Sequence, residues 1–219
     1  MNYLITVVGA EAAPKLEALC RELELPVSVA LWGRGTAVQS MLDLLGIEST
    51  EKRVVLSVAS AEKTQAYLQA ARNKLFIGVP GHGIVIAVPV KSVGGGKTLA
   101  YLNGGQPAAK YTPELHVHYE LIIAIANEGR TDLVMNAARA AGATGGTVLH
   151  GKGTGSKNAE KFYNVSIAQE KEVLLIVSRA DRKAEIMASI LKSAGPASEA
   201  GAITFSLPIS EVAGFGLLD

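Results

Sequence analysis

The two halves of this chain carry the same landmarks at an almost constant distance along the sequence. The matching pairs are Gly33 with Gly151, Glu51 with Glu170, and Pro89 with Pro208, which lie 118, 119 and 119 residues apart. Around the middle pair, Glu-Lys-Arg-Val-Val in the first half corresponds to Glu-Lys-Glu-Val-Leu in the second. A near-constant offset across three landmarks indicates an internal repeat, so we expect one structural unit in each half of the chain.

Within each half, the spacing of apolar residues predicts the order strand, helix, strand, strand, helix, strand. The first helix carries Cys20 on its apolar face, so this thiol is predicted to lie in the core. Ser60, Thr131 and Asp181 are predicted to cap later helices. The order is typical of the ferredoxin-like βαββαβ unit, in which both helices cover one face of an antiparallel sheet. The predicted fold class is therefore α+β, with two tandem ferredoxin-like units.

A stretch rich in glycine and proline separates the two predicted units. We place the first unit at residues 1–93, the linker at 94–115 and the second unit at 116–219. The chain has 219 residues, of which 48% are hydrophobic, so each unit has enough apolar content for a core.

The composition argues against several classes of function. A formal net charge of +1 does not favour general binding to nucleic acids or membrane surfaces. The single cysteine excludes an internal disulfide and fits a reducing compartment. Met1–Val8 has the pattern of a strand rather than a signal peptide, and no run of about 18 apolar residues is present. A cytoplasmic location is therefore expected.

Three glycine-rich segments are candidates for ligand binding, each predicted to form a turn after or before a strand. Glycines let backbone N–H groups approach an anion without a Cβ in the way, and threonine hydroxyls add donors. Turn geometry with positive φ explains the same glycines equally well. The candidate residues are Gly33, Gly35 and Thr36 after a strand ending at Trp32; Gly78, Gly81, His82 and Gly83; and Thr147, Gly151, Gly153, Thr154 and Gly155 around a strand ending at His150.

The loops that follow the two matching glycine segments differ in their apolar content. Residues 38–45 carry apolar side chains at helical spacing, so the first loop is predicted to fold as a short helix against the body. Residues 154–161 have no apolar face, so the second loop is predicted to be mobile and to contact a partner protein. The candidate partner-binding residues are Lys157, Asn158, Lys161 and Phe162.

Other chemistries are less well supported by the residues. His116 and His118 lie on the same face of a predicted strand and could contribute to a metal site, but only His82 and His150 remain as further histidines. We predict no metal site. The spacing of the residues suggests no nucleophile–base set or carboxylate pair, so no catalytic residues are predicted. A small enzyme that uses the cleft between the repeats stays an alternative.

The second half of the chain, from Leu121 to Gly214, resembles the nitrogen-regulatory PII signalling family. The order and spacing of five short motifs carry this resemblance. They are Glu120–Ile125, Gly145–Val148, Gly151-Lys152-Gly153, Tyr163–Ser166 and Leu207–Glu211. The first half resembles a more diverged copy, with its own Val88–Ser92 ending.

The resemblance implies a trimeric ring of ferredoxin-like units that binds adenine nucleotides (ATP, ADP or AMP) in the clefts between units and has no enzymatic activity. It implies that the loop at 154–162 changes shape with ligand and docks on a transporter, an enzyme or a regulator. It also implies a second phosphate-binding turn at Gly195–Gly201 and, in the first half, at Gly78–Gly83. Gly195 and Gly201 join the candidate ligand-binding residues on this ground.

Several departures from the family pattern affect the expected ligand. The lysine that usually follows the second glycine turn is replaced by Ala202 or Ile84, and residues 209–219 contain no basic residue. The family's metal-assisting glutamine corresponds to Gly155 or Ala37. Without these groups, the negative charge of a triphosphate is poorly neutralised. An alternative is therefore a metal-responsive trimer of the cation-tolerance kind, which shares the fold.

Overall fold

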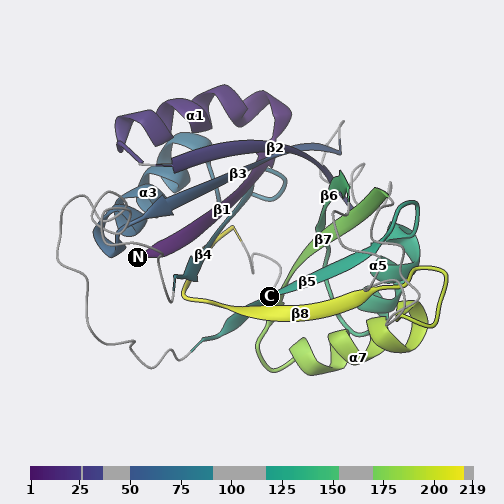
Figure 1. Cartoon of the computed structure of the whole chain (residues 1–219). Helices are drawn as coiled ribbons and strands as arrows, with labels where there is room; N and C mark the ends of the chain where they lie inside the picture. Colours follow the sequence, from purple (N-terminus) through teal and green to yellow (C-terminus); the bar gives the residue numbers. More distant parts are fainter. Residues whose placement is uncertain (26, 37–49, 91–116, 153–169, 215–219) are drawn as a thin grey trace, which may run out of the picture. The chain divides into compact units, whose positions relative to one another are not determined.

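The computed structural model describes residues 1–25, 27–36, 50–90, 117–152 and 170–214 (Figure 1). The described chain is a mixed α+β structure with antiparallel strands, as the apolar spacing predicts. It divides into two compact units, which are described separately. The predicted linker at 94–115 and the boundaries on either side of it lie outside the described residues.

Unit 1 comprises Met1–Leu31, Asp43–Val117 and Pro208–Asp219. Its elements are β1 (Asn2–Gly9), η1 (Ala10–Ala12), α1 (Ala13–Glu22), the first part of β2 (Val27–Gly35), β3 (Glu51–Ala59), α3 (Ala61–Leu75), β4 (Gly83–Pro89) and β9 (Glu211–Ala213). The strand order is β2-β3-β1-β4-β9, and β1 pairs antiparallel with both β3 and β4. Helices α1 and α3 pack against each other.

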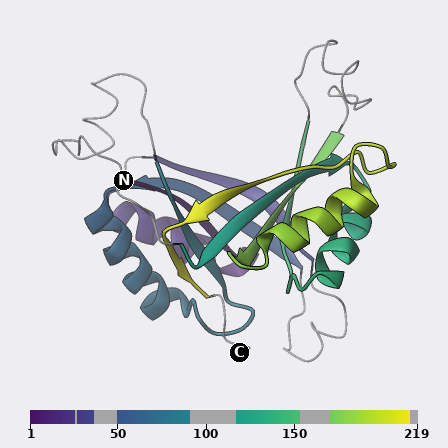
Figure 2. The same cartoon turned by 90° about the horizontal axis from the view of Figure 1, so that it is seen from below.

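Unit 2 comprises Trp32–Leu42 and His118–Leu207. Its elements are β5 (Tyr119–Asn127), α5 (Thr131–Ala140), β6 (Thr147–Lys152), β7 (Glu170–Arg179), α7 (Lys183–Ala194) and β8 (Ile203–Ile209). The strand order is β8-β5-β7-β6, with β7 antiparallel to both β5 and β6. Helices α5 and α7 pack side by side on one face of this sheet (Figure 2). The order of helices and strands in each unit is that of the split βαβ motif.

Each unit is completed by a segment from the other half of the sequence. The end of β2 pairs with β6 in unit 2, in the register Gly33↔Leu149, Arg34↔Val148 and Gly35↔Thr147. Strand β9, from the end of the chain, pairs with β4 in unit 1 through Val85↔Ala213, Ile86↔Val212 and Ala87↔Glu211. The two halves of the sequence therefore exchange edge strands.

The exchanged end of β2 corrects one sequence-based prediction. Gly33 and Gly35 were expected in a turn after Trp32, but the strand continues through Gly35. A Cβ on Gly33 would lie 3.1 Å from Leu149 Cδ2 and from the carbonyl oxygen of Val148, so the close approach of β6 favours glycine. Gly151 was likewise expected beyond the strand but belongs to β6.

Thr36 connects the exchanged end of β2 by hydrogen bonds to the segment that precedes β6. Its backbone N–H donates to the carbonyl oxygen of Gly146 at 3.1 Å, and its hydroxyl accepts from the Gly146 N–H at 2.8 Å. The Arg139 guanidinium on α5 donates to the Thr36 carbonyl oxygen. These bonds pair backbone groups that an edge strand would otherwise leave exposed.

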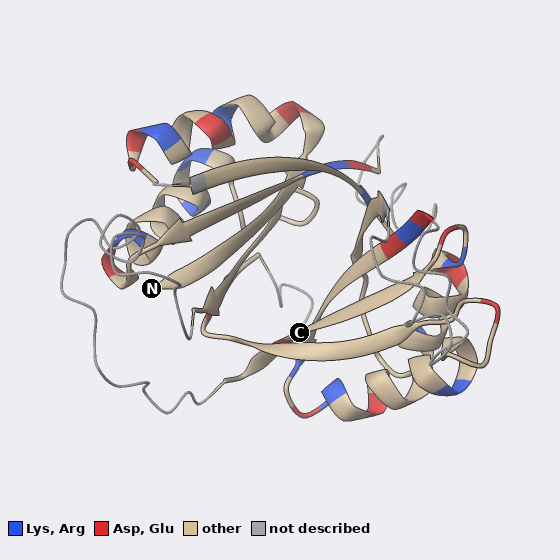
Figure 3. Ribbon diagram, in the orientation of Figure 1, with Lys and Arg blue, Asp and Glu red and all other residues tan. Residues whose placement is uncertain are grey.

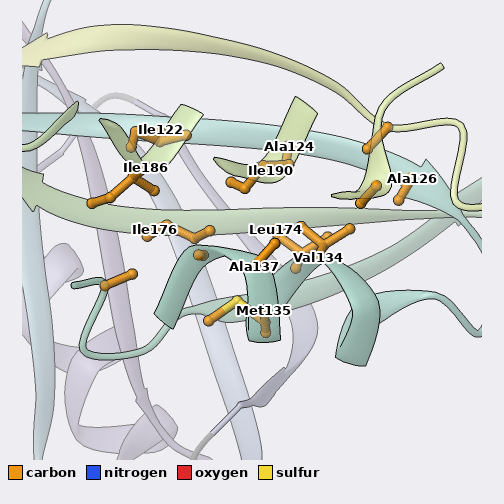
Figure 4. Close-up of a cluster of buried hydrophobic side chains, with 14 of the residues drawn as sticks. Ile122, Ala124, Ala126, Val134, Met135, Ala137, Leu174, Ile176, Ile186 and Ile190 are labelled. Carbon is orange, nitrogen blue, oxygen red and sulfur yellow. The ribbon is translucent and has the colours of Figure 1, made fainter. Parts of the chain in front are cut away.

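Both units have aliphatic cores between the sheet and its helices. In unit 2, buried side chains of β5 and β7, among them Ile122 and Leu174, pack on Val134 of α5 and Ile190 of α7 (Figure 4). In unit 1, Cys20 is buried in the core, as its position on the helix predicts. The largest buried side chain of this core is Tyr67, whose hydroxyl lies 2.7 Å from Thr6 Oγ1.

The three predicted helix caps have different outcomes. The prediction for Asp181 is wrong, because Arg182 occupies the N-cap position of α7. Ser60 is the N-cap of α3, and its hydroxyl oxygen accepts from the Lys63 N–H at 3.2 Å. The prediction for Thr131 is wrong, because Arg130 occupies the N-cap position of α5 and Thr131 is the first helical residue. Among the described residues, no helix is long and apolar enough to cross a membrane.

Candidate functional site

A polar cluster lies at one end of the unit 2 sheet, where β5 and β6 end and β7 begins. The register places Gly151 of β6 and Asn127 of β5 on either side of Lys171 of β7. Residues 153–169 connect β6 to β7 at this end. Figure 3 shows acidic and basic residues next to one another at the start of β7. The cluster therefore lies at the base of the connection that contains the predicted partner loop.

Lys171 is a buried cation in this cluster, with 8% of its surface exposed. Its ammonium donates to Asn127 Oδ1, a neutral acceptor. Burial removes water from the ammonium and lowers the pKa of Lys171 below its ordinary value of 10.5. A cation with a neutral partner can accept an anionic ligand more easily than one already paired with a carboxylate.

Asn127 links this cation to the turn between α7 and β8. Its backbone N–H donates to the carbonyl oxygen of Ala200 at 2.9 Å, and its side-chain amide donates to that of Glu199 at 3.0 Å. Arg130, three residues further on, pairs with the Glu199 carboxylate at 3.1 Å. A continuous chain of polar contacts thus joins the 195–201 turn to the start of β7.

Glu172 anchors the same end of the sheet to helix α5. Its Oε2 accepts from the backbone N–H groups of Arg130 and Thr131 at 3.2 and 3.0 Å, and from the Thr131 hydroxyl at 2.7 Å. The side chain is 4% exposed, and its Oε1 lies 3.9 Å from Nδ1 of His150 on β6. A carboxylate at a helix N-terminus satisfies unpaired N–H groups and is favoured by the helix dipole. Glu172 therefore does the capping that was predicted for Thr131.

The lowered pKa of Lys171 predicts a specific dependence of stability on pH. Between the lowered pKa and 10.5, the folded chain binds fewer protons at this site than the unfolded chain, so the free energy of unfolding should rise with pH across that window. In Lys171→Met this rise should be smaller. Urea denaturation of both proteins at a series of pH values measures the two slopes; equal slopes would contradict the burial of a desolvated ammonium.

In the predicted phosphate-binding turn at Gly195–Gly201, the N–H groups of both glycines already donate hydrogen bonds within the protein. The Gly195 N–H donates to the carbonyl oxygen of Leu191, and the Gly201 N–H to that of Ser198, each at 3.1 Å. A Cβ on Gly195 would lie 2.2 Å from the Leu191 carbonyl oxygen, so packing alone accounts for this glycine. Ligand contacts at this turn would therefore come largely from the side chains around it.

The matching turn of unit 1 contains three glycines with positive φ: Gly78 at 120°, Gly81 at 87° and Gly83 at 129°. A Cβ on Gly83 would lie 2.2 Å from the Val7 carbonyl oxygen, whereas one on Gly78 would meet nothing within 4 Å. The His82 ring packs edge-on against Phe76, with 6.0 Å between the ring centroids. Close packing explains Gly83, whereas Gly78 has open space where a Cβ would stand.

The remaining predicted residues divide between buried, open and undescribed positions. Thr147 is buried in β6, next to the exchanged strand. Gly151 has open space where a Cβ would stand, on the strand that leads into the partner loop. Gly153, Thr154, Gly155, Lys157, Asn158, Lys161 and Phe162 lie outside the described residues. So does the predicted helix at 38–45.

The metal alternative receives no support from the described part of the chain, where no three His, Cys, Asp or Glu side chains are grouped to hold a metal ion. His118 is described, and His116 is not. Sequence reasoning missed the residues that form the polar cluster: Asn127, Arg130, Lys171, Glu172 and Glu199. Three of them flank predicted strands, but only the pairing of β5, β6 and β7 brings them together.

Unit 2 is an antiparallel α+β unit with this polar cluster at the base of a long connection. Residues 119–215 match the family model described as nitrogen regulatory protein P-II. This match confirms the resemblance of the second half of the chain to PII-like proteins. It covers unit 2 apart from Trp32–Leu42 and His118, and it includes the whole of β9.

Searches against other known proteins add little to this assignment. No curated protein matches the chain. Among solved structures, an unknown protein from Galdieria sulphuraria shares 11% identity at a TM-score of 0.29, with coverage of 94% of this chain and 97% of that one. A microcompartment protein from Desulfitobacterium hafniense DCB shares 10% identity at a TM-score of 0.26, with coverage of 96% and 95%. Scores this low do not establish a shared fold.

Proposed function

We propose that this chain is a non-catalytic PII-like regulator that senses an adenine nucleotide and controls a partner protein through residues 154–162. In this proposal unit 1 is a diverged copy of unit 2, and the chain assembles as a homo-oligomer, most simply a trimer. The partner is a transporter or an enzyme, by analogy with the family alone.

The observation that carries the proposal is the chain of contacts from the 195–201 turn to the loop base. Glu199 and Ala200 bond to Asn127, Asn127 accepts from Lys171, and Lys171 directly follows Glu170 at the first position of β7. A ligand that moves the turn would act on the strand from which the partner loop emerges. Both ends of this chain of contacts lie within the segment that matches the PII model.

Lys171 and Arg130 supply positive charge in place of the lysine and arginines that the resemblance to the family implies around the glycine turn. Lys171 is buried with a neutral partner, and Arg130 lies at the start of α5. Both can interact with phosphate oxygens, and Arg can do so through two parallel hydrogen bonds. These two cations are therefore proposed to replace the lysine and arginines of the family pattern.

Calorimetric titration of the full chain with ATP, ADP and AMP, each with and without magnesium, tests the proposal. Binding of at least one nucleotide at micromolar concentrations is expected, and it should be weakened in Lys171→Met. Absence of heat with all three nucleotides at millimolar concentrations would contradict nucleotide sensing. Binding that Lys171→Met leaves unchanged would place the nucleotide elsewhere.

A further inference from the structure

The proposed nucleotide site of unit 2 contains an acidic side chain that already pairs with one of its cations. Glu199 Oε2 lies 3.1 Å from the Arg130 guanidinium. The side chains are 76% and 46% exposed, so both are accessible to a ligand from solvent. An exposed ion pair of this kind is weak and readily displaced.

The backbone around Glu199 is held firmly, although its side chain is exposed. Asn127 donates to the carbonyl oxygens of Glu199 and Ala200, which belong to two consecutive peptide groups. The Ser198 hydroxyl accepts from the Ala200 N–H at 3.2 Å and donates to the Gly195 carbonyl oxygen at 2.8 Å. The turn therefore presents the carboxylate to Arg130 from a fixed position, and only the side chain is free to move.

We infer that Glu199 is a built-in competitor of the anionic effector. Its carboxylate forms an ion pair with the Arg130 guanidinium, which phosphate oxygens would otherwise contact. The same carboxylate repels a polyanion that approaches the turn. Binding requires the Glu199 side chain to rotate away from Arg130. This inference rests on the proposed function, because it assumes that the nucleotide binds at this turn.

The effect of Glu199 on binding should depend on the charge of the nucleotide. Repulsion between Glu199 and a nucleotide grows with the number of phosphate charges, since Coulomb energy is proportional to the product of the charges. Removing the Glu199 charge should therefore strengthen ATP binding more than AMP binding. Salt screens such exposed charges, so the gain should shrink as the ionic strength increases.

The test compares nucleotide binding by the full chain and three variants: Glu199→Gln, Arg130→Gln and Glu185→Gln. Glu185→Gln is the matched control, because it removes the same charge and breaks a similar exposed pair, Arg182–Glu185 at 3.0 Å, near the other end of α7. At low salt, Glu199→Gln should bind ATP about three- to tenfold more tightly than the wild type. Arg130→Gln should bind it more weakly, and Glu185→Gln about equally.

The outcomes separate this inference from the proposed function. If the wild type binds nucleotide and Glu199→Gln binds it no more tightly than Glu185→Gln, the competitor role is wrong while nucleotide sensing stands. If only Glu199→Gln gives measurable binding, the competitor role is supported, and the Glu199 carboxylate prevents nucleotide binding in the wild type. If neither the wild type nor any variant binds, the proposed function and this inference fail together.

Discussion

Glu172→Ala is expected to lower the free energy of unfolding by about 2–5 kcal/mol, one of the two largest effects in the molecule. The substitution leaves two backbone N–H groups and the Thr131 hydroxyl at the start of α5 without their acceptor. These donors lie at or next to a buried position, so water replaces the lost bonds poorly. Chemical denaturation monitored by circular dichroism measures the loss.

Two further variants define the cause of this loss. Glu172→Gln keeps one acceptor oxygen in the same place and should lose clearly less stability than Glu172→Ala. Glu170→Ala, on the same strand but exposed, should lose less than about 0.5 kcal/mol. Equal losses for Glu172→Ala and Glu170→Ala would show that Glu172 does not cap α5.

The second large effect is expected from removal of the end of the chain. A protein that ends at Ile209 lacks β9, which pairs with β4 and contributes Ala213 to the core of unit 1. It also lacks Ser210, which bonds to the carbonyl oxygen of Ala87 and to the side chain of Asn2. The expected loss is about 2–4 kcal/mol. Although the deleted residues follow unit 2 in the sequence, the loss should fall on unit 1.

Hydrogen exchange resolves which unit is affected. Amides of β1 and β4 should exchange faster in the shortened chain, whereas those of β5 and β7 should keep their protection. A chain that ends at Gly214 retains β9 and serves as the control. Faster exchange confined to β5 and β7 would contradict the exchange of edge strands.

The order of elements could be predicted because it depends on local patterns. Apolar spacing places the strands and helices of both halves, Cys20 falls in the core, and Ser60 caps α3 through a bond to a residue three positions away. Such features need only neighbours in the sequence. The resemblance of the second half to the PII family was likewise inferred from short motifs in order, and residues 119–215 match the family model.

The exchanged strands could not be predicted in this way. Gly33 and Gly35 carry the composition of a turn, yet they form strand because they pair with β6, and the close approach of β6 favours glycine at position 33. The paired residues of β2 and β6 are more than 100 positions apart in the sequence, and rules based on neighbouring residues do not predict such a pairing. Glu172 is similar, since it caps a helix that begins 41 residues earlier.

The candidate site was only partly accessible to sequence reasoning for a related reason. Glycines at 195 and 201 suggested free backbone amides, but those amides donate to Leu191 in the last turn of α7 and to Ser198 in the 195–201 turn. The groups that remain available are the side chains of Lys171 and Arg130, whose proximity to the turn depends on the strand register and on Asn127. Residue type alone did not distinguish them from the other lysines and arginines of the chain.

The central claim is that a nucleotide bound by unit 2 acts on the 195–201 turn and, through Asn127 and Lys171, on the base of the partner loop. Hydrogen exchange of the full chain with and without saturating ATP and magnesium tests this most directly. The account predicts slower exchange at 127–131, 170–172 and 195–202 when ATP is bound, with little change in β1 and β3. Binding of ATP with no change at these three segments would contradict it.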